Sequence, residues 1–199
     1  MSKIALDQGA TIDKYVGDSV MAFFGDPESR GAINDATACV QMAVRMQKRM
    51  RELQSEWRDM GLENPFQLRI GINTGFCTVG NFGSEDRMDY TIIGGEVNLA
   101  SRLESACEPG GILLSHETYS LVKDVVQGEE QEPITVKGLT KPVRTYRVVD
   151  TYEVLEQEGK IVRHDKDAFK VFVDLERLKD GERSEAVSAV KELLARLKG

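Results

Sequence analysis

Residues Tyr90-Thr-Ile-Ile-Gly-Gly-Glu-Val-Asn-Leu-Ala-Ser-Arg-Leu103 form the stretch of this sequence that decides its fold. A helical pattern follows the glycine pair, and we predict a helix over residues 95–108 that Pro109-Gly-Gly111 ends. Within this helix Asn98 and Arg102 are spaced i, i+4, so both side chains leave the same helix face. They can therefore reach one ligand together.

A second informative segment, residues 10–24, predicts a β-hairpin. Two β-rich runs flank Gly17-Asp18, a dipeptide that signals a turn. Beside the glycine of a tight turn, the carboxylate of Asp18 can point at a metal ion without a bulky neighbour. Lys14 precedes the turn and offers only hydrogen-bond donors.

The remaining patterns alternate between helix and strand. Apolar residues recur every three or four positions from Ile33 to Trp57, which predicts a long helix. Residues 116 onward are expected to form a helix with Ser115 as its N-cap. Further strands are expected at residues 67–73, 75–83, 112–115, 134–136 and 143–149. This order predicts an α+β, ferredoxin-like sheet with helices packed on it.

The chain is expected to hold two parts, a domain over residues 1–150 and an extension over residues 151–199. In the extension, apolar residues alternate as in a strand over residues 169–175, and residues 187–197 follow helical spacing. We therefore expect a small folded α/β unit. Its strand is expected to cover an open edge of the main sheet.

Composition excludes several classes of protein. A net charge of −7 argues against nucleic-acid binding, which depends on clustered Lys and Arg. No apolar run approaches the roughly 18 residues that span a bilayer, so direct membrane insertion is not expected. Three cysteines without a CxxC pair predict neither a disulfide framework nor a zinc site. We therefore expect a cytoplasmic location.

Together, residues 90–103 and the hairpin segment Thr11-Ile-Asp-Lys-Tyr-Val-Gly-Asp-Ser-Val-Met-Ala-Phe-Phe24 resemble the catalytic domain of class III nucleotidyl cyclases. The resemblance covers about residues 1–150. It implies an adenylyl cyclase of a bacterial subclass, which converts ATP to 3′,5′-cyclic AMP and pyrophosphate in cyclic-nucleotide signalling.

The resemblance also implies roles for individual residues. Lys14 and Thr91 would read the purine: lysine at the first position selects adenine, and threonine at the second is typical of one bacterial subclass. Asn98 would orient the ribose, and Arg102 would stabilise charge on the transferring phosphoryl group. Lys137, within Val136-Lys-Gly138, would contact the β- and γ-phosphates.

In the family, two metal ions, Mg²⁺ or Mn²⁺, assist the reaction, and Asp18 matches one of their carboxylate ligands. The other aspartate lies on an earlier strand in the family, and no such motif precedes Asp18 here; Asp13 is out of register for it. We therefore expect an N-terminally truncated domain that lacks the first strand and helices. Such a chain is expected to be weak or inactive alone.

Family members pair head-to-tail, so the resemblance implies a homodimer with composite active sites and an upstream sensor domain in the parent protein. One alternative stays open. A non-catalytic module of the same fold, which dimerises or binds nucleotide to pass a signal, would need no complete metal site.

Overall fold

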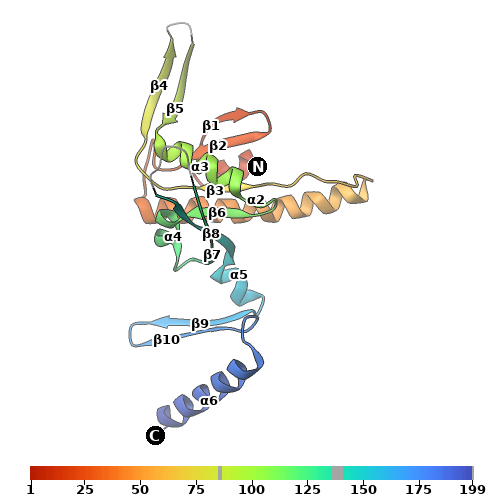
Figure 1. Cartoon of the computed structure of the whole chain (residues 1–199), viewed down its shortest axis with the longest axis vertical. Helices are drawn as coiled ribbons and strands as arrows, with labels where there is room; N and C mark the ends of the chain where they lie inside the picture. The colour runs from red at the N-terminus through yellow and green to blue at the C-terminus, as the bar shows by residue number, and fades with distance from the viewer. Residues whose placement is uncertain (85–86, 136–140, 199) are drawn as a thin grey trace. The chain divides into compact units, whose positions relative to one another are not determined.

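The structure is a computed structural model and describes residues 1–84, 87–135 and 141–198. The chain forms two compact units, Met1–Thr151 and Tyr152–Gly199 (Figure 1). The first unit contains the elements α1 (Ser2–Asp7), β1 (Thr11–Val16), β2 (Ser19–Phe23), α2 (Ala32–Asp59), β3 (Ile70–Ile72), β4 (Thr78–Ser84), β5 (Arg87–Ile93), α3 (Gly95–Ala106), β6 (Ile112–Ser115), α4 (His116–Val122), β7 (Val126–Ile134) and β8 (Val143–Thr151). The second contains α5 (Tyr152–Gln157), β9 (Ile161–Lys166), β10 (Phe169–Asp174) and α6 (Asp180–Leu197).

A four-stranded mixed sheet, in the order β3-β6-β8-β7, forms the centre of the first unit. β3 runs parallel to β6, and the other neighbours are antiparallel. Along β6 the side chains alternate between the faces: Ile112 and Leu114 pack in the cluster that includes α2, whereas Leu113 packs against α3. Helices thus cover both faces of the sheet, which confirms the predicted α+β class.

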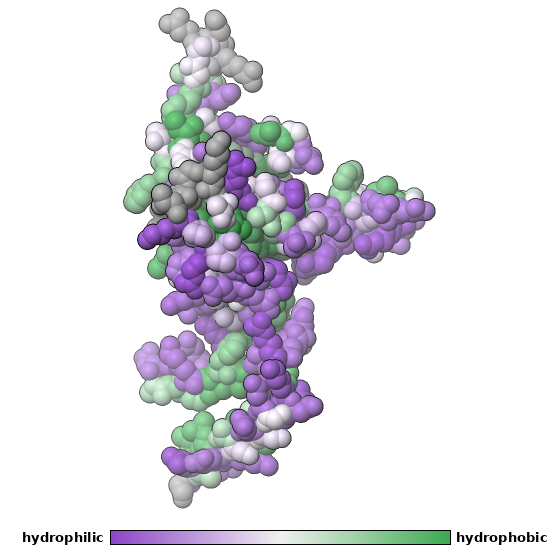
Figure 2. Space-filling view, viewed as in Figure 1, coloured by the Kyte–Doolittle hydropathy of each residue, from purple (hydrophilic) through white to green (hydrophobic). Residues whose placement is uncertain are grey.

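The long helix α2 buries its first half and exposes much of its second. Ala36, Val40 and Ala43 lie in the main core, as the apolar spacing predicted, but Ile33 is 61% exposed. Figure 2 shows a largely hydrophilic surface on the part of α2 that extends beyond the sheet. There, Arg49 forms exposed ion pairs with nearby glutamates of the same helix. Such pairs favour solubility and add little stability.

Asp35 holds the start of α2 to the preceding segment. Its carboxylate accepts hydrogen bonds from the Ser29 hydroxyl at 2.6 Å and from the Arg30 backbone, and it pairs with the Arg30 side chain at 3.3 Å. Burial alone would raise the pKa of Asp35, but these bonds and the charge of Arg30 lower it below its ordinary value of 3.8. The ionised form is therefore the one that stabilises the fold.

We predict that Asp35→Asn lowers the free energy of unfolding at pH 7 by about 1–3 kcal/mol. Because the folded-state pKa is lowered, the wild-type stabilisation is present above pH 3.8 and is lost as the pH falls through the folded-state value. Urea unfolding of both proteins across this range measures the effect. A difference between them that stays constant as the pH falls would contradict it.

The two hairpins of the first unit form separate two-stranded sheets, β1-β2 and β4-β5. Gly17 has a φ of 62° in the first turn, which explains the glycine there and confirms the predicted hairpin. β1 contains a bulge: Ile12 pairs with Ala22 and Lys14 pairs with Met21, which leaves Asp13 as the extra residue.

Three expectations for the strands need correction. β3 is only three residues long, because the carbonyl of Leu68 is bonded to the Gln47 side chain and the Gly110 amide instead of a neighbouring strand. The glycine-punctuated stretch 75–83 contributes only β4, and its partner is the later strand β5. The strand expected at 134–136 is β7, which begins at Val126; residue 136 lies outside the described part.

The second unit forms its own hairpin, in which β10 pairs antiparallel with β9. The expectation that residues 169–175 cover an edge of the main sheet is thus wrong: in the described chain their backbone partners are in β9. α6 follows as the predicted helix. Among the described residues, no helix is long and apolar enough to cross a membrane.

Candidate active site

Helix α3 carries Asn98 and Arg102 and lies directly against β3. A Cβ atom on Gly71 of β3 would lie 2.1 Å from the Glu104 backbone nitrogen, so only glycine allows this close approach. Leu99 and Leu103 are buried on the face of α3 that points to the sheet. This packing fixes the opposite face of the helix.

Asn98 and Arg102 both lie on the exposed surface of α3. In the described part of the chain, neither side chain has a hydrogen-bond or ion-pair partner. A structural arginine would normally be paired or hydrogen-bonded, whereas this guanidinium is available to an anion. The structure thus presents both side chains to solvent from one rigid helix.

The start of α3 is fastened to the end of β3. The Asn73 side-chain amide donates to the Glu96 carbonyl at 3.0 Å and to its carboxylate at 2.7 Å. The preceding residue, Gly94, has a φ of 153°, a conformation that favours glycine. These contacts hold the first turn of the helix in register with the sheet.

Lys14 and Thr91, predicted to read the same base, meet at one carboxylate. The hydroxyl of Thr91 donates to Asp13 Oδ2 at 2.6 Å, and the Ile92 amide donates to the same oxygen at 3.1 Å. Lys14 Nζ lies 3.1 Å from Asp13 Oδ1. The Asp13 side chain has no exposed surface, whereas that of Lys14 is 41% exposed. The structure therefore brings the two predicted base-reading residues together.

Asp13 is ionised at neutral pH. Burial would raise its pKa, but the hydrogen bonds from Thr91 and Ile92 and the charge of Lys14 lower it overall. Next to Thr91, Tyr90 donates a hydrogen bond to Asp26, a second link between β5 and the end of the β1-β2 hairpin. Two successive residues of β5 are thus tied to the segment that carries Lys14.

Asp18 lies in the exposed turn between β1 and β2. Among the described residues, no three His, Cys, Asp or Glu side chains gather closely enough to hold a metal ion. One exposed carboxylate does not make a metal site, so the described residues of a single chain do not fit the two-ion site of the family.

Lys137, the predicted phosphate contact, lies outside the described residues.

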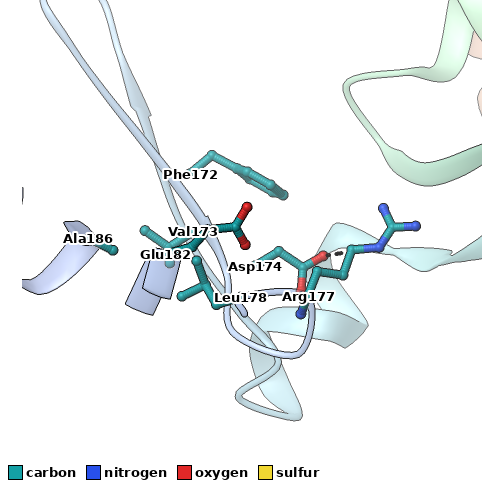
Figure 3. Close-up of a pocket in the computed structure, with 7 residues that line it drawn as sticks. All are labelled: Phe172, Val173, Asp174, Arg177, Leu178, Glu182 and Ala186. Carbon is teal, nitrogen blue, oxygen red and sulfur yellow. Dashed lines mark hydrogen bonds and ion pairs between the residues drawn. The ribbon is translucent and has the colours of Figure 1, made fainter. Parts of the chain in front are cut away.

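The second unit contains a pocket lined by Phe172, Val173, Asp174, Arg177, Leu178, Glu182 and Ala186 (Figure 3). The figure shows the Asp174–Arg177 ion pair beside apolar side chains. This pocket contains none of the predicted site residues.

Comparison with known proteins identifies the fold and its family. The family model for the adenylate and guanylate cyclase catalytic domain matches residues 6–150. The chain belongs to this family.

Solved cyclases resemble the chain in structure as well. The adenylyl cyclase CyaB from P. aeruginosa is 61% identical, with a TM-score of 0.73, and the match covers 75% of this chain and 76% of the chain in the solved structure. The guanylyl cyclase Cya2 is 36% identical, with a TM-score of 0.70 over 76% of each chain.

A curated relative, the terminal-differentiation specific adenylate cyclase of Dictyostelium discoideum, is 34% identical over an alignment of 151 residues, and the match covers 72% of this chain and 7% of the relative. The chain spans less than a third of the length of the curated relatives it matches first. These comparisons support the predicted cyclase family and include both adenylyl and guanylyl cyclases.

Asp13 is the functional candidate in this cyclase domain that the sequence did not indicate. Its role depends on the bulge in β1, which turns its side chain toward Lys14 and Thr91. No local pattern in residues 11–16 predicts a bulge, so the sequence alone showed only that Asp13 did not match the missing metal aspartate.

Proposed function

We propose that this cyclase domain converts ATP to 3′,5′-cyclic AMP and pyrophosphate. The observation that carries the proposal is the meeting of Lys14 and Thr91 at one buried carboxylate. Two residues far apart in the sequence form one surface for a base, next to the helix that presents Asn98 and Arg102. The 61% identity to an adenylyl cyclase supports the same substrate.

The choice of adenine rests on hydrogen-bond chemistry. The Lys14 ammonium can only donate, which suits the ring nitrogen N1 of adenine, an acceptor. The corresponding N1 of guanine carries a proton and would face the ammonium as a second donor. Lys14 therefore favours ATP, although the family also contains guanylyl cyclases such as Cya2.

The exposed face of α3 would hold the reacting part of the substrate. Asn98 would orient the ribose, and Arg102, one turn further along, would donate to oxygens of the α-phosphate as charge develops there. The ribose 3′-hydroxyl gives its proton to solvent water, and its oxygen forms a bond to the α-phosphorus. The bond from the α-phosphorus to the bridging oxygen breaks, and its electrons leave with pyrophosphate.

A divalent cation, Mg²⁺ or Mn²⁺, would use Asp18 as one ligand and would lower the charge on the phosphates. Further ligands must come from outside the described residues of one chain. We propose a homodimer in which Asp18 of one chain meets Asn98 and Arg102 of its partner, so that each site is composite.

Lys137 would contact the β- and γ-phosphates of the substrate. The longer parent protein would add a sensor domain, and the whole would be a regulated signalling enzyme of the cytoplasm.

The alternative, a non-catalytic signalling module, receives no support from the comparisons. To pass a signal by dimerisation, such a module would need only a surface that binds a second copy. An arginine and an asparagine on one helix face, without side-chain partners among the described residues and on the helix that follows Thr91, would then have no purpose.

Complementation between two inactive variants tests the composite site. Because the curated relatives are longer, the assays use both this chain and a form extended at its N-terminus by the preceding coding sequence, hereafter the extended form. We expect Asp18→Asn and Arg102→Ala each to be inactive. Mixed in equal amounts, they should recover about a quarter of the wild-type rate, because half the dimers carry one intact site.

Two controls accompany the mixture. In the first, wild type is mixed with the double variant Asp18→Asn/Arg102→Ala. A dimer of these two chains has no intact site, so the loss of wild-type activity measures the efficiency of subunit exchange. If exchange is complete and the two single variants recover no activity, both residues act within one chain and the composite arrangement is wrong.

A further inference from the structure

Asp13 controls the hydrogen-bonding role of Thr91. A hydroxyl group has one proton and two lone pairs. In this structure the proton of Thr91 is donated to Asp13 Oδ2 at 2.6 Å, and Thr91 is only 5% exposed. A charged acceptor at this distance makes a strong hydrogen bond. Thr91 can then offer a ligand only its lone pairs.

The acceptor role has a chemical consequence for the base. Adenine presents the N6 amino group, a donor, where guanine presents the O6 carbonyl, an acceptor. A threonine fixed as an acceptor matches adenine and repels guanine. A threonine with a free proton would accommodate either base by rotation of its hydroxyl.

Asp13 acts on Lys14 as well. Lys14 Nζ lies 3.1 Å from Asp13 Oδ1, and this oxygen accepts no hydrogen bond that would compete with the ion pair among the described residues. The bulge lets these consecutive side chains meet, although in a regular strand they would point to opposite faces. The ammonium and the Thr91 hydroxyl are thereby held by the two oxygens of one carboxylate.

We propose that Asp13 is a positioning residue that sets adenine specificity, by fixing Thr91 as an acceptor and by holding the Lys14 donor in place. This inference rests on the proposed function. In this proposal Asp13 and Thr91 together provide the hydrogen-bond acceptor for the base. A carboxylate at position 91 would provide such an acceptor by itself. Asp13 itself is buried and need not touch the base.

Binding of ATP and of GTP to the chain, measured by calorimetry without turnover, tests the assignment. Lys14, Thr91, Asn98 and Arg102 belong to the same chain, so the base-binding half needs no complete metal site. We expect wild type to prefer ATP, and Asp13→Asn to reduce the ATP-to-GTP affinity ratio by about tenfold or more. The neutral amide of the variant accepts from Thr91 more weakly than the carboxylate and no longer forms an ion pair with Lys14. The Thr91 hydroxyl can then turn its proton toward guanine O6.

Two more variants separate specificity from folding. Thr91→Asp in the Asp13→Asn background restores a fixed acceptor and should recover the preference for ATP. Asp35→Asn is the matched control, because Asp35 is also a buried, hydrogen-bonded aspartate but is bonded to Ser29 and Arg30. It should lower stability and leave the affinity ratio unchanged.

The outcomes distinguish the inference from the proposed function. If wild type prefers ATP and folded Asp13→Asn has the same ATP-to-GTP affinity ratio, Asp13 does not set specificity. The inference is then overturned, and the proposed function is not. If wild type binds ATP no better than GTP, adenine recognition by this site fails, and the proposed function fails with it.

Discussion

Arg102→Ala is expected to lower the rate of cyclic AMP formation by the extended form by about 100- to 1000-fold, the usual cost of removing a donor that stabilises a developing oxyanion. Arg102 is exposed on α3 and has no side-chain partner among the described residues. Its removal should therefore leave the melting temperature unchanged. KM for ATP should change much less than kcat, because the interaction strengthens in the transition state.

The measurement is a steady-state rate with ATP and Mn²⁺, accompanied by thermal unfolding of each variant. Arg51→Ala, on the exposed surface of α2, is the control for loss of a surface arginine. A variant Arg102→Ala that retains more than about a tenth of the wild-type kcat would show that this guanidinium makes no essential contact in the transition state.

Gly71→Ala is expected to damage both stability and activity. The added methyl group would meet the Glu104 nitrogen at 2.1 Å and the Ala100 carbonyl oxygen at 2.5 Å, both backbone atoms of α3 that cannot turn aside. This clash can be relieved only if α3 moves away from β3. Overpacking of this kind costs about 1–3 kcal/mol or more, and the shift would displace Asn98 and Arg102 from the substrate.

Urea unfolding and the cyclase rate together measure this effect. Gly95→Ala is the control for stability, because a methyl group there meets nothing within 4 Å and alanine favours a helix. It should leave the unfolding free energy unchanged or raise it. If Gly71→Ala were as stable as wild type, α3 would not pack on β3 as closely as the structure shows.

The sequence predicted those features that depend on local periodicity. The apolar spacing in residues 33–57 and the glycine signals around α3 identified α2 and α3, which lie on the two faces of the main sheet. Spacing along α3 also placed Asn98 and Arg102 on one exposed face. Such features follow from helix geometry, which a single segment determines.

Features that depend on contacts between distant segments could not be predicted. The short length of β3 follows from hydrogen bonds to Gln47 of α2 and to Gly110. The placement of Asp13 follows from a bulge in β1 together with its bonds to β5. To predict either feature, one must know which segments are neighbours in the fold. The propensities within one segment do not give this information.

The most direct test of the account is the product formed from ATP and from GTP by the extended form with Mn²⁺, assayed beside this chain alone. We expect cyclic AMP from ATP at a rate at least about tenfold above cyclic GMP from GTP, with weak or no activity from this chain. Equal rates with both nucleotides, or no cyclic AMP from an extended form that binds ATP, would contradict the assignment of this domain as an adenylyl cyclase.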